Sequence, residues 1–304
     1  MHEQHHGPNP TTLTRRFAKL TRLTLSHVRW SGAVVDLIGS FHEIDTLIIK
    51  NIAEFDSLPS LISCDKRSNG IRVRSLSFDQ GTWGARQVCF AALSAIFDPS
   101  SLTILTLDCL SSILLPDLEA FLRDTGRNLH HLRYWHDEDG LGETDPGPAF
   151  HPLSLSHCPT LKSLHLVINL DLYRWPGYDG AVQWTGTMHM IQNAVHLLET
   201  VKQIQLVIRL HNHWYPTRER KSIEEECHLI RGLEIVKWDL LDEATCGYTS
   251  LQKIGIKFVR ATKGFIRDRA FLGAVKAAEE TLRTRMPRRA RDLLHIQYSL
   301  SVTH

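Results

Sequence analysis

The feature that most constrains the fold of this chain is a six-residue pattern, apolar-x-x-apolar-x-apolar, that occurs nine times in order. One such hexad carries little information, because about half of all residues in proteins are apolar. Most copies are followed by a polar or turn residue and then by helix-like sequence, so the nine together indicate an internal repeat. The hexads begin at residues 20, 44, 73, 102, 129, 161, 201, 251 and 293.

The spacing within each hexad predicts a short β-strand. The fourth and sixth residues alternate on one side of the strand and point into the core, while the third, fifth and seventh point to the other side. So short a strand is not stable alone and must stack on a neighbour. Helical patterns over 32–39, 85–97, 115–123 and 188–200 connect the hexads, and such connections make consecutive strands parallel.

We therefore predict an α/β fold, an irregular leucine-rich-repeat solenoid (horseshoe) with a curved parallel sheet and outer helices. The 42 leucines, about 14% of the chain, would fill the core of this array. Residues 1–12 are expected to form a flexible polar tail, and residues 13–304 a single repeat domain. Insertions are expected near 137–152, 171–186 and 217–245, where turn residues or longer gaps interrupt the repeat.

Composition and charge narrow the compartment and the partners. The 35 basic and 33 acidic residues nearly cancel, which gives no support for nucleic-acid or membrane-surface binding. The polar N-terminus does not resemble a secretory signal, and no stretch reaches the roughly 18 apolar residues of a membrane helix. The six cysteines are scattered without a Cys-x-x-Cys pair, which is typical of reduced thiols. We expect a cytoplasmic or nuclear protein without a membrane partner.

Motifs of known chemistry are missing from the sequence. It holds neither a Gly-x-Ser-x-Gly elbow nor a Gly-rich phosphate loop, and the 18 histidines lack metal-ligand spacing. A basic run over 283–291 fits either a nuclear or nucleic-acid signal or a solvated linker into the last strand. We expect no catalytic residue, no metal and no cofactor.

The concave face of the predicted sheet is the candidate functional surface. Its central column consists of the fifth hexad residues, namely Thr24, Ile48, Ser77, Thr106, Arg133, His165, Gln205, Gly255 and Gln297. Arginine and tryptophan commonly anchor protein interfaces. We predict a protein-binding surface made of His131, Arg133, Trp135, His165, Gln205, Lys253 and Lys257. An aromatic segment with Tyr173, Trp175, Tyr178 and Trp184 is a second candidate, for which a hydrophobic plug on the flank of the array is an equal interpretation.

Two passages carry a family resemblance. The unit Ser-His-Cys-Pro-Thr-Leu-Lys-Ser-Leu-His-Leu over 156–166, followed by Asn169 and Leu172, resembles the cysteine-containing leucine-rich repeat of F-box proteins. The passage over 115–132 resembles the irregular repeat arrays of large fungal F-box families. The likeness extends over roughly residues 13 to 300 and implies the substrate-recognition part of an F-box ubiquitin-ligase subunit. Because the first hexad begins at Leu20, no adaptor-binding F-box segment is recognisable, and an adaptor is expected as a partner only if such a segment lies upstream.

Three functions are compatible with these observations. The favoured one is a non-catalytic repeat domain that holds a protein partner on its concave face. A scaffold or assembly protein without a ubiquitin link is the first alternative, and an unrecognised hydrolase or transferase that uses histidines and acidic loops is the second.

Overall fold

The computed structural model of the 304-residue chain describes residues 17–52, 70–79, 86–111, 115–137, 153–171, 181–211, 230, 233, 236–260, 268–286 and 288–299. The N-terminal tail predicted over 1–12 and the insertion predicted over 137–152 lie outside these ranges, except for Asp137.

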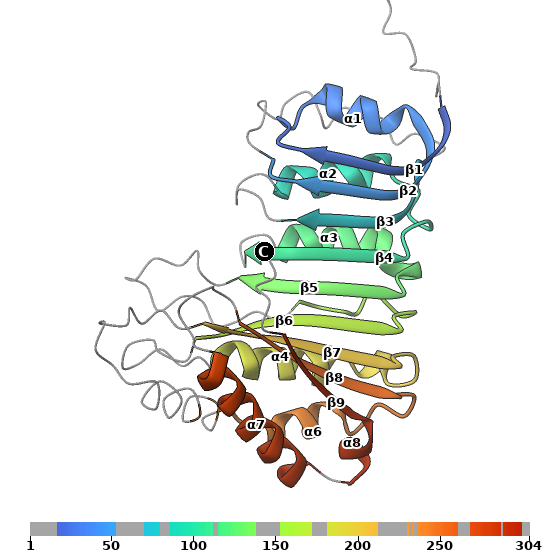
Figure 1. The fold of residues 1–304 in the computed structure, drawn as a ribbon. Helices are drawn as coiled ribbons and strands as arrows, with labels where there is room; N and C mark the ends of the chain where they lie inside the picture. Colours follow the sequence, from blue (N-terminus) through green and yellow to red (C-terminus); the bar gives the residue numbers. More distant parts are fainter. Residues whose placement is uncertain are drawn as a thin grey trace, which may run out of the picture.

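A single nine-stranded sheet runs through the described ranges, with its strands in the order of the sequence from β1 to β9. Every neighbouring pair is parallel, and the sheet is open, since β1 and β9 occupy its two ends (Figure 1). The strands are β1 Phe17–Ser26, β2 Phe41–Lys50, β3 Arg72–Asp79, β4 Ile104–Ser111, β5 His131–Asp137, β6 Ser163–Asp171, β7 Gln203–His211, β8 Lys253–Arg260 and β9 Leu294–Ser299. The predicted α/β fold with a parallel sheet is thus confirmed.

The helices lie in the connections between neighbouring strands and pack on one side of the sheet, behind most of the strands in Figure 1. The α-helices are α1 Gly32–Gly39, α2 Arg86–Ile96, α3 Leu115–Thr125, α4 Ala181–Asn193, α6 Asp239–Thr245, α7 Asp268–Arg285 and α8 Arg288–Leu293, and the 3-10 turns are η4 Gly126–Asn128 and η5 Val195–Leu197. We call the helix-covered side of the sheet the helix side and the opposite side the front face.

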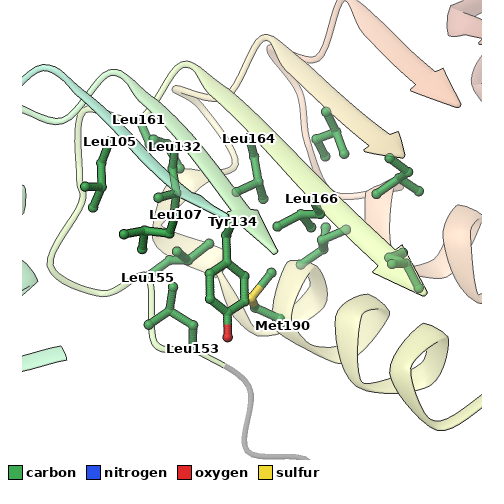
Figure 2. Packing of buried hydrophobic residues seen from close by; sticks show 14 of the residues in the cluster. Leu105, Leu107, Leu132, Tyr134, Leu153, Leu155, Leu161, Leu164, Leu166 and Met190 are labelled. Carbon is green, nitrogen blue, oxygen red and sulfur yellow. The ribbon is translucent and has the colours of Figure 1, made fainter. Parts of the chain in front are cut away.

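The hexads set the strand register. Leu76 of β3 pairs with Leu105 of β4, which pairs with Leu132 of β5, and the same rows continue through the eighth hexad. The fourth and sixth hexad residues therefore stack from strand to strand on the helix side. Figure 2 shows two such rows, with Leu105, Leu132 and Leu164 in one and Leu107, Tyr134 and Leu166 in the next.

The ninth hexad was predicted two residues out of register. Ile254 pairs with Leu294 and not with Ile296, because α8 extends to Leu293 and the strand begins one residue later. A shift of two residues keeps the same side chains on the helix side, so the hexad pattern could not detect it. In the fifth-position column His295 therefore replaces Gln297, which pairs with Lys257.

Helix boundaries follow the buried stripes. The helices predicted over 32–39, 85–97 and 115–123 correspond to α1, α2 and α3. The helix predicted over 188–200 instead begins at Ala181 and ends at Asn193. Its core stripe is Trp184, Met188 and Ile191, all at most 1% exposed, and this spacing of four and three residues starts earlier than the predicted segment.

The aromatic segment and the third insertion are described in part. Trp184 lies in the core with its ring 4.8 Å from that of Trp238, and its indole nitrogen donates to the Lys237 carbonyl at 2.9 Å. Trp184 is therefore a core residue and not part of an exposed binding loop. Residues 172–180 and 212–229 lie outside the described ranges. Of the helix predicted from about residue 222, Ile230 and Leu233 are described as helical, and α6 begins at Asp239.

Polar side chains tie successive turns together at the start of the strands. Asn128 precedes the fifth hexad and donates through Nδ2 to the Ser100 carbonyl at 2.8 Å. Thr160 precedes the sixth and donates through Oγ1 to the Arg127 carbonyl at 2.9 Å. Ser250 forms a similar bond to the turn that precedes β7. These bonds satisfy carbonyl groups that lie in turns, outside the hydrogen-bond ladders of the sheet. They recur at the same place relative to successive hexads.

Candidate functional site

The front face of strands β5 to β8 carries all seven residues predicted to bind a partner. On these strands the helix-side positions alternate with front-face positions, so the register assigns each side chain to a face. We call this surface the β5–β8 face; its described side chains, with Gly255, are His131, Arg133, Trp135, Ser163, His165, Val167, Asn169, Gln203, Gln205, Val207, Arg209, Lys253, Gly255, Lys257 and Val259.

The predicted residues fall into three adjacent rows. Arg133, His165 and Gln205 pair directly across β5, β6 and β7 and form the central row, which ends at Gly255 on β8. The row that starts at His131 ends at Lys253, and the row that starts at Trp135 ends at Lys257. The structure thus brings the predicted residues together on one surface, with cations at both of its lateral ends.

Trp135 is not the exposed side chain that an interface anchor requires. It is 9% exposed and forms a small apolar cluster with Val167, Val207 and Val259, separate from the main core on the other side of the sheet. The guanidinium carbon of Arg209 lies 4.2 Å from the centroid of the Trp135 ring, at the distance of a cation–π contact. We therefore assign Trp135 a supporting position beneath the surface.

Sequence reasoning missed the valines and Arg209. A signal for the valines was present, because Leu-Val-Ile occurs at 166–168 and again at 206–208, which breaks the alternation of apolar and polar residues. Strands that are apolar on both sides are buried on both sides. The runs thus pointed to a second buried patch on the front face. No comparable signal singled out Arg209.

Two buried nitrogens on this face have no hydrogen-bond partner among the described residues, namely Trp135 Nε1 and His165 Nε2. Trp135 pairs with Val167, two residues beyond His165, so the two side chains occupy diagonal positions on adjacent strands. Most buried polar atoms in proteins are hydrogen-bonded, and each exception calls for an explanation. An indole N–H can only donate, so Trp135 lacks an acceptor oxygen.

The electrostatics of the face are basic around a neutral histidine. Burial, together with the positive charges of Arg133 and Lys257, lowers the pKa of His165 to about 4, so its ring is uncharged near neutral pH. Arg133 Nε lies 3.1 Å from Asp108 Oδ1 of β4, which balances one of the cations. Among the predicted residues of the face, Arg133, Lys253 and Lys257 carry positive charge, and Asp108 pairs with the first of them.

The cysteine at the centre of the family resemblance is a core residue. Cys158 is 0% exposed, and burial raises the pKa of its thiol to about 12, so it stays protonated and unreactive near neutral pH. It lies beside Gly126, where an added Cβ would come within 2.8 Å of the His157 carbonyl oxygen and 3.1 Å of the sulfur. The cysteine and the glycine therefore serve the close packing of two successive turns.

The histidines predicted not to chelate a metal are also described in part. The rings of His130 and His131 lie 6.4 Å apart with their planes nearly perpendicular. Across the described ranges, no three His, Cys, Asp or Glu side chains are grouped as they would be around a metal ion. In the same ranges, no helix is both long enough and apolar enough to cross a membrane.

Comparison of the chain with protein-family models, with curated proteins and with solved structures found no match.

Proposed function

We propose that this chain is a non-catalytic, leucine-rich-repeat-like solenoid that binds another protein on its β5–β8 face, in the cytosol or the nucleus. Support for the solenoid comes from the sheet, in which each strand pairs only with its neighbours in sequence. The bonds from Asn128 and Thr160 to the preceding turns repeat with the strands, as expected for stacked units.

The observation that carries the binding proposal is the combination of basic side chains and unpartnered buried nitrogens on one face. Arg133 and His131 are exposed, and His165, Gln205, Lys253 and Lys257 are half-buried. Side chains of these types form hydrogen bonds and ion pairs across protein interfaces. In the next rows of the same face lies the apolar cluster of Trp135 with Val167, Val207 and Val259.

A pair of charge-reversal variants tests this proposal. Binding partners recovered with the wild-type chain should be lost with the double variant Arg133→Glu and Lys257→Glu. The matched control is Arg22→Glu, since Arg22 is exposed on β1 in the same row as His131 and Lys253 but at the far end of the sheet. Loss of the same partners with the control, or their retention with the double variant, would place the binding surface elsewhere.

The finer proposal is that the chain acts as the substrate-recognition part of an F-box ubiquitin-ligase subunit. It is supported by the resemblance of the unit around Cys158. Immunoprecipitation from cells that express the complete gene should then recover a ligase adaptor and a cullin. If partners are recovered through the β5–β8 face without either of these, the scaffold alternative is the correct one.

A further inference from the structure

The β5–β8 face has a charge pattern that specifies its partner further than the proposed function does. Arg133 lies at one side on β5, and Lys253 and Lys257 lie at the other side on β8. Uncharged polar side chains, those of His165 and Gln205, occupy the middle of the central row. Among these residues the positive charge thus lies at the two sides of the face. Arg133 also pairs with Asp108, and Arg209 on β7 is stacked over Trp135.

The width of the face sets the length of a matching segment. Neighbouring strands lie roughly 4.8 Å apart, so three spacings from β5 to β8 amount to about 14 Å. An extended chain advances about 3.3 Å per residue, so a segment of about five residues crosses the face. Acidic residues at both ends of such a segment reach the two cationic sides.

Gly255 leaves the middle of β8 without a side chain. It lies between Lys253 and Lys257 on the front face, and its neighbour in the central row is Gln205. A Cβ added at Gly255 would meet Gln205 Cγ at 3.5 Å, an ordinary contact, so packing within the chain does not demand a glycine there. Gly255 is buried, and the Gln205 side chain lies against the position of that Cβ.

The two buried nitrogens without a described partner lie on β5 and β6, on the same half of the face as Arg133. Trp135 Nε1 is a donor inside a side chain that is only 9% exposed, and no described residue accepts its hydrogen. His165 Nε2 is also without a described partner. A backbone carbonyl or a carboxylate oxygen of a crossing chain is an acceptor of the kind that this surface lacks.

We propose that the β5–β8 face binds an extended acidic segment of a protein, which crosses the strands with one carboxylate near Arg133 and another between Lys253 and Lys257. The proposal rests on the proposed function and adds the chemistry of the partner. A nucleic-acid strand also carries negative charge. However, surfaces that bind single-stranded nucleic acid usually carry exposed aromatic rings on which the bases stack. The Trp135 ring is covered by Arg209, so this face offers no such ring at that position.

Labelled synthetic peptides of equal length test the proposal by fluorescence anisotropy with the full chain. The first peptide carries two glutamates separated by three serines, the second carries glutamines in their place, and the third carries the two glutamates side by side. We expect the first to bind most tightly, by roughly tenfold over the glutamine peptide. Equal binding of the glutamine peptide would overturn the proposal.

Variants locate the binding and separate it from misfolding. Lys257→Glu should weaken the first peptide by roughly tenfold, and Lys257→Gln should weaken it less, while Arg22→Glu should leave it unchanged. Thermal unfolding that matches wild type establishes that each variant is folded. Equal weakening by Arg22→Glu, or tighter binding of an oligothymidine of equal charge that Lys257→Glu also weakens, would overturn the proposal. If none of the peptides binds while cellular partners are still lost with the Arg133 and Lys257 double variant, the proposal of an acidic segment is wrong. The proposed function then stands.

Discussion

The guanidinium of Arg209 on β7 lies 4.2 Å from the centre of the Trp135 ring on β5, across the intervening strand β6. This contact involves the apolar cluster that Trp135 forms with Val167, Val207 and Val259. It links two strands that do not pair with each other. Trp135 is held beneath the guanidinium in a fixed position, with its indole nitrogen buried and without a described partner. The contact thus links β5 and β7 on the front face through side chains.

A double-mutant cycle measures this contact. Trp135→Leu and Arg209→Met each retain an apolar side chain, so the cycle isolates the interaction between the cation and the ring. We expect a coupling free energy of about 0.5–1 kcal/mol in urea unfolding. Additive effects of the two substitutions would mean that the stacking contributes nothing to stability.

The core rows predict an asymmetry between the two faces of the sheet. Leu132 is 1% exposed on the helix side, so Leu132→Ala should lower the free energy of unfolding by about 2–5 kcal/mol. Thr106 of the adjacent strand lies on the front face, and Thr106→Ala should change the free energy of unfolding by less than about 0.5 kcal/mol. Chemical denaturation of both variants checks the prediction, and similar losses would contradict the assignment of faces.

The bonds between turns predict a repeated contribution to stability. Thr160 Oγ1 lies 2.9 Å from the Arg127 carbonyl oxygen and 3.2 Å from that of Leu129, so Thr160→Val should cost about 1 kcal/mol. Thr24 on β1 is exposed, and Thr24→Val serves as the control. In thermal unfolding, Thr160→Val should melt at a lower temperature than Thr24→Val. Equal melting temperatures would mean that the Thr160 bonds do not stabilise the stacking of the turns.

The pKa of His165 predicts a pH dependence. Because burial lowers this pKa from 6.5 in the unfolded chain to about 4 in the fold, the unfolded chain binds the proton first as the pH falls. The stability that depends on the neutral ring is therefore complete above pH 6.5 and is lost as the pH falls from 6.5 towards 4. The unfolding free energies of wild type and His165→Gln at pH 7 and pH 5 measure this loss.

Wild type should lose more stability than His165→Gln over this interval. Carboxylates that titrate in the same range affect both proteins alike and cancel in the difference. His131→Gln is the matched control, since His131 is exposed on the neighbouring strand and should follow wild type. If wild type and His165→Gln lose the same stability, the ring is not buried as described.

Much of the sheet could be predicted because its register is a property of the hexads. Leu76, Leu105 and Leu132 recur at the same hexad position, and a one-residue slip would turn them all away from the core. The ninth hexad failed because Leu294 and Ile296 lie on the same side, so a slip of two residues leaves both on the helix side. The early start of α4 at Ala181 was missed because Trp184 looked like part of an exposed aromatic segment.

The candidate surface was predictable only in outline. Alternation along the strands assigns Arg133, His165 and Gln205 to one face, and the structure pairs them directly. Sequence spacing does not reveal that Arg209 covers Trp135, because that contact depends on side-chain conformations across two strand intervals. For the same reason, the unpartnered state of Trp135 Nε1 and His165 Nε2 is visible only in three dimensions.

The central claim is that the β5–β8 face binds a protein partner, and site-specific photo-crosslinking in cells tests it most directly. A benzophenone amino acid is placed at Gln205, in the middle of the face, or at Thr24, in the same column on β1. We predict a crosslinked protein partner from position 205 that is lost when Lys257→Glu is added, and none from position 24. Crosslinks to the same partner from position 24 but not from position 205 would contradict the account.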